Sequence, residues 1–166
     1  MNKQRPFSKL KKTIESLFDD KLKMEFCCNS YPIRGQWGHK NSIPRYYVKL
    51  GKEIIWDFPK DFDMKELPFY YWAYNNHINE LVHDYIDAPI DKLLTKKFKY
   101  DKNTFIMQNL DLNQQDKLVI DYKLTEIFKA ADRRIGKEKL LIWAKKVANP
   151  KVDKIIEIRF NNQYSD

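Results

Sequence analysis

The sequence predicts a single-domain α+β protein: an N-terminal helix packed on a small antiparallel sheet, followed by a C-terminal helical half. Apolar residues recur at helical spacing over residues 7–18, and strand-like runs separated by turn residues fill residues 23–58. Helical spacing returns from Glu66 onward. A chain of 166 residues suits one domain, so we place the sheet-containing part at about residues 1–60 and the helical part at about residues 66–162 of a single domain spanning 1–166.

The first part begins with an amphipathic helix, whose apolar stripe is formed by Phe7, Leu10, Ile14, Leu17 and Phe18. Residues 23–31 are predicted to be a strand. Residues 32–44 contain two prolines and two glycines, the densest group of structure-breaking residues in the chain, and are predicted to be a loop. Residues 45–58 are predicted to be a hairpin, because apolar runs flank a glycine-containing turn near residues 50–52.

The second part is predicted to be mostly helical. A helix is expected over about residues 66–86, followed by a short helix that begins near Pro89. Residues 98–112 are predicted to be either a loop or an isolated strand. A long helix is expected over about residues 114–135, because apolar residues at helical spacing form one stripe: Ile120, Leu124, Ile127, Phe128, Ala131 and Ile135.

The last two helices are predicted on either side of a break at Asn149-Pro150. Gly136 is expected to end the long helix in the left-handed conformation, since glycine adopts it most easily. A helix then restarts in the sequence KEKLLIWAKKVA. The closing segment PKVDKIIEIRF is expected to be helical, although alternating apolar residues leave a strand open for residues 156–160.

The formal net charge is +8, and it is unevenly distributed. Residues 1–52 and 92–166 are basic, whereas residues 53–91 carry nine acidic and two basic side chains. One interpretation is a basic surface for nucleic acid or an acidic partner. The other is a lysine-rich solvated surface whose parts neutralise one another on folding.

Several protein classes are disfavoured by the composition. No apolar run approaches the roughly 18 residues of a membrane span, and the N-terminus lacks the apolar region of a secretory signal. Cys27 and Cys28 are adjacent, so a disulfide between them is not expected. We therefore expect a cytoplasmic protein with reduced thiols and no membrane partner.

The stretch ADRRIGKEKL, residues 130–139, has two interpretations. Arg133 and Arg134 are expected in the last helical turn, and Lys137 and Lys139 open the next helix, so the four side chains are a candidate anion site. The alternative is a purely structural corner, in which Asp132 pairs with Arg133. The stretch lacks the glycine spacing of a phosphate-binding loop.

Three short motifs carry a family resemblance: FSKLKKTIESLF at the start, GKEI at 51–54, and ADRRIGKEKL followed by NPKVDKIIEIRF. Together they resemble an uncharacterised family of small bacterial cytoplasmic proteins with a WSKLK-like opening helix and a late DRRxGKxxL corner. Phe7 stands where a tryptophan is common in that family. The resemblance implies an α+β fold and a bacterial origin, and no activity.

Aromatic and basic residues alternate in residues 31–47. The candidate binding residues there are Arg34, Trp37, His39, Arg45 and Tyr47. Tyrosine, tryptophan and arginine dominate protein interfaces, and aromatic rings beside cations also bind single-stranded nucleic acid. A third interpretation is that these aromatics only cover the sheet.

Catalytic and metal-binding patterns are weak. The segment HINELVHD lacks the histidine spacing of a zinc protease, and the cluster Asp57, Asp61, Asp63 and Glu66 is predicted to be a solvated acidic loop. We predict no catalytic residues, no metal and no cofactor. The prediction is a non-catalytic bacterial interaction protein that binds a macromolecular partner, a protein in preference to nucleic acid, through the loop 31–47. The alternative is a nucleic-acid-binding module that uses the basic N- and C-terminal segments. The sequence does not indicate the oligomeric state.

Overall fold

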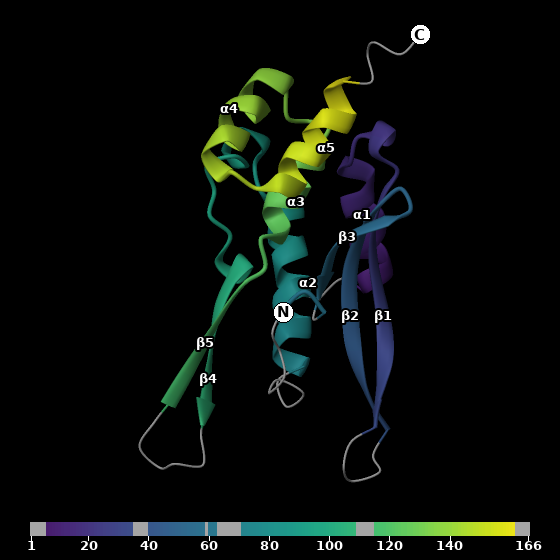
Figure 1. The fold of residues 1–166 in the computed structure, drawn as a ribbon, viewed down its shortest axis with the longest axis vertical. Coiled ribbons are helices and arrows are strands. Elements are labelled where there is room, and N and C mark those ends of the chain that lie inside the picture. Colours follow the sequence, from purple (N-terminus) through teal and green to yellow (C-terminus); the bar gives the residue numbers. More distant parts are fainter. Residues whose placement is uncertain (1–5, 35–39, 59, 63–70, 109–114, 162–166) are drawn as a thin grey trace.

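The computed structural model describes residues 6–34, 40–58, 60–62, 71–108 and 115–161. Two β-hairpins lie on either side of a central helix, α2, and the last three helices gather at one end of the molecule (Figure 1). The elements are α1 (Phe7–Leu17), η1 (Asp20–Leu22), β1 (Met24–Arg34), β2 (Lys40–Leu50), β3 (Glu53–Phe58), α2 (Tyr71–Asp87), η3 (Ile90–Lys92), η4 (Lys99–Asp101), β4 (Lys102–Gln108), β5 (Gln115–Asp121), α3 (Leu124–Ala131), α4 (Lys137–Val147) and α5 (Pro150–Asn161).

The predicted α+β class is confirmed: α1 packs on a three-stranded antiparallel sheet of order β1-β2-β3, and helices follow. α1 also protects the edge strand β1. The backbone N–H of Phe26 donates to Glu15 Oε1 at 2.9 Å, and Lys11 Nζ donates to the Phe26 carbonyl at 3.0 Å. These bonds satisfy edge groups that would otherwise be open to pairing with another strand.

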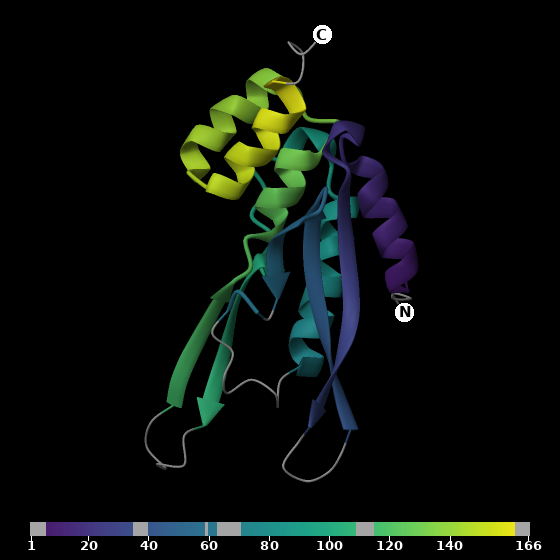
Figure 2. The ribbon, with the colours of Figure 1, turned by 45° about the vertical axis from the view of Figure 1, so that its right-hand side comes forward.

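The core lies between the sheet and helices α2, α3 and α5. The Phe128 ring of α3 contacts the rings of Phe26 and Tyr85, with centroids 5.7 Å and 5.3 Å away. Trp56 of β3 is buried, and its indole N–H donates to the Tyr122 carbonyl at 2.7 Å. Helix α1 packs against both β1 and α2, and the turned view (Figure 2) shows it alongside the long β1–β2 hairpin.

The loop predicted for residues 32–44 is wrong for the part that the structure describes. Pro32 lies in β1 opposite Ser42, and Pro44 lies in β2 opposite Ser30. The N–H of Phe26 points away from β2, toward α1. Alternate residues of a strand face the same neighbour, so the nitrogen of Pro32, six residues later in β1, also points away from β2. Both prolines therefore fall where the β1–β2 ladder uses no N–H group, which is the position that a strand tolerates.

The long helix predicted for residues 114–135 is also wrong. Residues 115–121 form β5, which pairs with β4, and helix α3 begins only at Leu124. Between β5 and α3, Lys123 has a positive φ of 52°, and the chain turns at this residue. Ile120 is buried and its neighbour Val119 is 49% exposed, so the two-residue period of a strand governs this segment.

The remaining segments agree with the predictions or resolve them. Gly51 forms the β2–β3 turn with φ of +62°. The undecided segment 98–112 contains η4 and β4, and residues 156–160 are helical. The predicted short helix after Pro89 is the single turn η3, and α2 is described from Tyr71 onward.

The two cysteines are free. Among the described residues, no helix is both long and apolar enough to cross a membrane.

Candidate functional site

The corner at residues 130–139 differs from the prediction in its helix boundaries. α3 ends at Ala131, and the extended residue Asp132 follows it. Gly136 has φ of −69° and precedes α4 as its N-cap, so it is not a left-handed helix stop. Arg133 and Arg134 therefore lie between the helices rather than in a last turn. Lys137 and Lys139 do open α4, as predicted.

Asp132 is the centre of this corner. Its side chain is fully buried and accepts two bonds from the Arg134 guanidinium, Nε to Oδ1 at 2.9 Å and Nη2 to Oδ2 at 2.7 Å. The Tyr85 hydroxyl of α2 donates to Oδ2 at 2.9 Å. The hydrogen bond with Asp132 raises the pKa of Arg134, and burial with the nearby carboxylate raises the pKa of Tyr85 well above its ordinary value. The ion pair predicted with Arg133 is formed by Arg134 instead.

Distant segments are tied to the same corner. The N–H of Asp19 donates to the Ala131 carbonyl at 2.8 Å, next to an isolated bridge between Phe18 and Asp132. Arg159 of α5 is 3% exposed, and its guanidinium donates to the carbonyls of Ala130 at 2.8 Å and Ile135 at 3.3 Å. Arg159 was not predicted as a site residue, because it lies on an apolar helical stripe and such a stripe indicates only packing.

A cavity of about 780 Å³ opens beside the corner. It is lined by Ile90, Asp91, Leu94, Arg134, Ile135, Gly136, Lys137, Glu138 and Lys139. Arg134 is already paired with Asp132, and Lys137 lies over the Phe160 ring at 5.5 Å. Because two acidic side chains share the lining with the lysines, the cavity has mixed charge rather than the uniform positive charge expected of an anion site.

The second candidate site contains a similar ion pair on the sheet. Arg45 of β2 binds Asp57 of β3 through two hydrogen bonds, one of them from Nε to Oδ1 at 2.8 Å. Asp57 is only 3% exposed, and its own N–H donates to Asp61 Oδ2 at 3.0 Å. Asp57 is therefore a buried ion-pair partner, which corrects the prediction of a solvated side chain at this position. Asp61 is exposed as predicted, and Asp63 and Glu66 lie outside the described residues.

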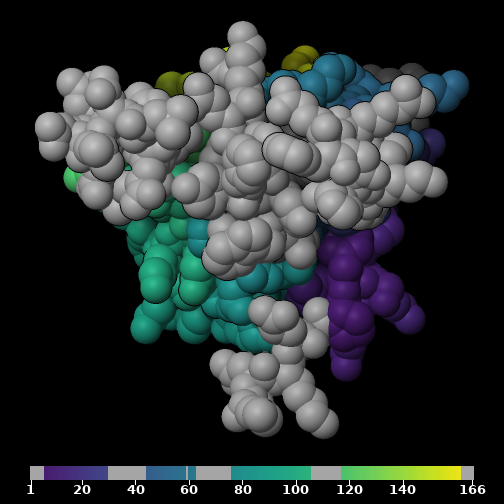
Figure 3. Space-filling view, turned by 90° about the horizontal axis from the view of Figure 1, so that it is seen from below, coloured from purple at the N-terminus to yellow at the C-terminus, as the bar shows by residue number. Residues whose placement is uncertain are grey.

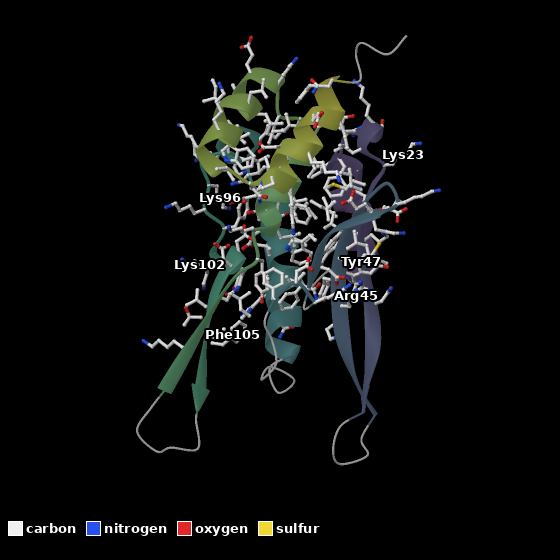
Figure 4. All side chains as sticks on the ribbon, in the orientation of Figure 1. Lys23, Arg45, Tyr47, Lys96, Lys102 and Phe105 are labelled. Atoms are coloured by element: carbon white, nitrogen blue, oxygen red, sulfur yellow. The ribbon has the colours of Figure 1, made fainter. Side chains whose placement is uncertain are left out.

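Tyr47 lies beside this pair and is held by two neighbouring side chains. The Arg45 guanidinium lies 4.7 Å from the centroid of the Tyr47 ring, and Asn29 Nδ2 donates to the Tyr47 hydroxyl at 3.0 Å. Figure 4 shows Arg45 and Tyr47 together on β2, across the molecule from Lys96, Lys102 and Phe105. The tyrosine remains half-buried, on the sheet face opposite Tyr46, which is in the core.

Two of the five predicted binding residues have described side chains, Arg45 and Tyr47, and the structure brings these two together. Arg34 ends β1, and only its backbone position is described. Trp37 and His39 lie outside the described residues. Asn29 was missed, because a lone asparagine in a strand has no sequence signal, whereas the strand pairing places it opposite Arg45.

A half-buried carboxylate, that of Asp101, supports the start of α3. The carboxylate of Asp101 accepts hydrogen bonds from the Leu124 N–H at 2.9 Å and from the Thr125 hydroxyl. Burial raises the pKa of Asp101 to about 6, although these bonds lower it. On the same helix, burial lowers the pKa of Lys129, whose Nζ donates to the Lys96 carbonyl at 3.1 Å. Both side chains serve backbone groups, so they stabilise the fold.

Comparison with known proteins gives one family match, which covers residues 6–160 and so nearly the whole chain. The chain belongs to the SF0329 protein family. The match includes the opening helix, the β2–β3 turn and the corner at residues 130–139. No curated protein and no solved structure matches the chain. The description of the SF0329 family names no activity, so membership brings no catalytic residues to this chain.

The described part of this SF0329 family member contains no group of three or more histidine, cysteine or acidic side chains arranged to hold a metal ion. On α2, His83 Nδ1 pairs with Asp87 at 3.0 Å, and burial lowers the pKa of His77. The His77 ring packs against Tyr100 and Phe105, with centroids 5.7 Å and 5.6 Å away. Its role is therefore packing between α2 and the β4 hairpin.

Proposed function

We propose that the chain is a non-catalytic interaction protein of the bacterial cytoplasm, which binds a protein partner through the outer face of the β1–β2 hairpin. The observation that carries the proposal is the fixed position of Tyr47. Its ring is stacked on Arg45, its hydroxyl is hydrogen-bonded to Asn29, and it is still partly exposed. An aromatic ring that loses little freedom on binding is a favourable interface anchor.

The arginines favour a protein partner over a nucleic acid. Four arginine side chains are described, and three of them pair with carboxylates: Arg45 with Asp57, Arg134 with Asp132, and Arg159 with Asp19. A guanidinium that is held by a carboxylate is not available for phosphate, and phosphate contacts dominate nucleic-acid affinity. The nucleic-acid alternative then depends on exposed lysines such as Lys139.

The test is affinity capture from the source cells, with the captured material identified at low and at near-physiological salt. Tyr47→Ala is compared with Lys49→Ala, which changes the same strand and face without removing the aromatic anchor. We expect Tyr47→Ala to abolish a salt-resistant protein complex and Lys49→Ala to retain it. Both variants are expected to keep the parent melting temperature within a few degrees, because both side chains are partly exposed.

Two results would overturn the proposal. One is a complex that survives Tyr47→Ala unchanged. The other is recovery of nucleic acid alone, whose binding is lost steeply as salt rises, since counterion release controls that dependence. The second result would instead support the nucleic-acid alternative.

A further inference from the structure

Helix α4 exposes an apolar pair on its outer surface. Leu141 is 37% exposed and Ile142 is 61% exposed, and Ile142 is the most exposed large hydrophobic side chain among the described residues. The inner side of the same helix is occupied by Leu140 and Ala144, which are buried. Adjacent apolar side chains turned outward are unfavourable in water unless another surface covers them.

Leu141, but not Ile142, lines a groove of about 600 Å³ between α4 and α5. Its apolar lining is formed by Leu141, Ala144, Ala148, Ile156 and Phe160. Lys137 lies over Phe160 at one end, and the short connection between the helices closes the other, so α4 and α5 run antiparallel along the groove. Figure 2 shows the two helices side by side at the end of the molecule away from the hairpins.

The two rims of the groove carry opposite charges. Lys137 and Lys145 line it from α4, and Asp153 and Glu157 line it from α5. Within the part of the chain that the structure describes, none of these four side chains forms an ion pair; the salt bridge of α5 with the sheet uses Lys154 and Glu53 instead. The rims therefore keep their charges for a partner.

We propose that this groove is the interface of a homodimer, in which a second copy of the chain packs its own α4–α5 groove against the first. The axis of a two-fold dimer lies in the interface. With the axis along the groove, each α4 faces the partner's α5, so the lysine rim meets the acidic rim twice. With the axis across the groove, α4 would face α4 and lysines would oppose lysines. The charge pattern thus selects the first arrangement, a four-helix packing.

The groove is separate from the proposed partner face. Tyr47 lies at mid-height on β2, at the right of Figure 4, whereas α4 lies at the upper left of Figure 1. Viewed from the hairpin end (Figure 3), the described surface is formed mainly by α1, α2 and the segment before β4. A dimer through α4 and α5 therefore leaves the surface around Tyr47 accessible in each of the two copies. The proposed dimer does not depend on the proposed function.

The experiment is sedimentation velocity of the purified chain over a range of concentrations. We expect a reversible monomer–dimer equilibrium. Leu141→Asp should abolish the dimer, whereas Val119→Asp, at an exposed apolar position on β5 (49% exposed), should not change it. Thermal unfolding at a concentration where the parent is monomeric shows that both variants fold.

Charge exchange tests the arrangement of the dimer. Lys145→Glu or Asp153→Lys alone should weaken the dimer about tenfold or more, because each substitution acts at two symmetric contacts. The combined variant should return the dissociation constant to within about threefold of the parent value, since opposite charges again face one another. A chain that stays monomeric to about 1 mM, where even weak association is seen, overturns the proposal. Equal effects of Leu141→Asp and Val119→Asp, or no rescue in the combined variant, overturn it as well.

Discussion

Two arginine–aspartate pairs in this protein have the same chemistry and different roles. In each pair, the guanidinium binds a nearly fully buried carboxylate through two hydrogen bonds: Arg134 with Asp132 at the corner, and Arg45 with Asp57 on the sheet. Each pair also has a tyrosine. At the corner it is Tyr85, which is fully buried; on the sheet it is Tyr47, which is half-buried.

The difference lies in what each pair connects. Asp132 joins Arg134 to Tyr85 of α2, in a corner whose backbone also bonds to the residues that follow α1. Asp57 joins neighbouring strands, and Arg45 then supports a ring at the surface. The pair stabilises the fold where its tyrosine is buried, and it positions a surface side chain where the tyrosine is only half-buried. The stability effects should differ accordingly.

The largest effect is expected for Asp132→Ala. This change leaves the Arg134 guanidinium and the Tyr85 hydroxyl without their acceptor, so the free energy of unfolding should fall by about 3–5 kcal/mol. Denaturant unfolding measures the loss. Asp91→Ala, at an exposed position nearby, is the control and should change stability by less than about 0.5 kcal/mol. A small effect of Asp132→Ala would show that the contacts of Asp132 do not stabilise the fold.

Arg45→Ala should have the next largest effect, about 3 kcal/mol, because it leaves Asp57 buried without its cation. The double variant Arg45→Ala with Asp57→Ala should recover part of this loss, since neither charge is then unpaired. Denaturant unfolding of the single and double variants gives the coupling energy. If the coupling is larger here than between Arg134 and Asp132, the comparison is reversed.

Asp101 extends the comparison to a half-buried carboxylate that caps a helix instead of binding an arginine. Its pKa is raised from 3.8 to about 6, so the folded state binds the proton more tightly than the unfolded state does. Its contribution to stability is therefore fully present below about pH 4 and is lost as pH rises through about 6, by about 3 kcal/mol at most. In Asp101→Asn this part of the pH dependence should disappear from unfolding curves measured between pH 3.5 and pH 7. An unchanged pH profile in the variant would contradict the assignment.

The smallest effects concern two glycines. Gly51→Ala should lower the free energy of unfolding by about 1 kcal/mol, because φ is +62° there and alanine resists positive φ. Gly136→Ala should change it by less than about 0.5 kcal/mol, because φ is −69° and no atom lies within 4 Å of the added Cβ. Melting curves of the two variants distinguish them. Equal losses would mean that Gly136 also needs the freedom of glycine.

Much of the fold was predictable from local pattern. The helix at residues 7–18, the turn at Gly51 and the helices of residues 137–147 and 150–161 all follow from apolar spacing and turn residues. β5 was not predictable in this way, because Ile120 fits the helical stripe with Leu124 and Ile127 and also the alternation of a strand with Leu118. Only pairing with β4 decides between them, and that partner lies outside any local window.

For the candidate sites, the sequence by itself determined which chemical groups are present: arginines at 133 and 134, an aspartate at 132, and an aromatic-basic run around Arg45 and Tyr47. Only the tertiary structure decided how they pair. Asp132 takes Arg134 rather than its neighbour Arg133, and Arg45 takes an aspartate from the next strand. The physical reason is burial: a carboxylate that leaves water must find the cation whose geometry allows two hydrogen bonds, and chain packing sets that geometry.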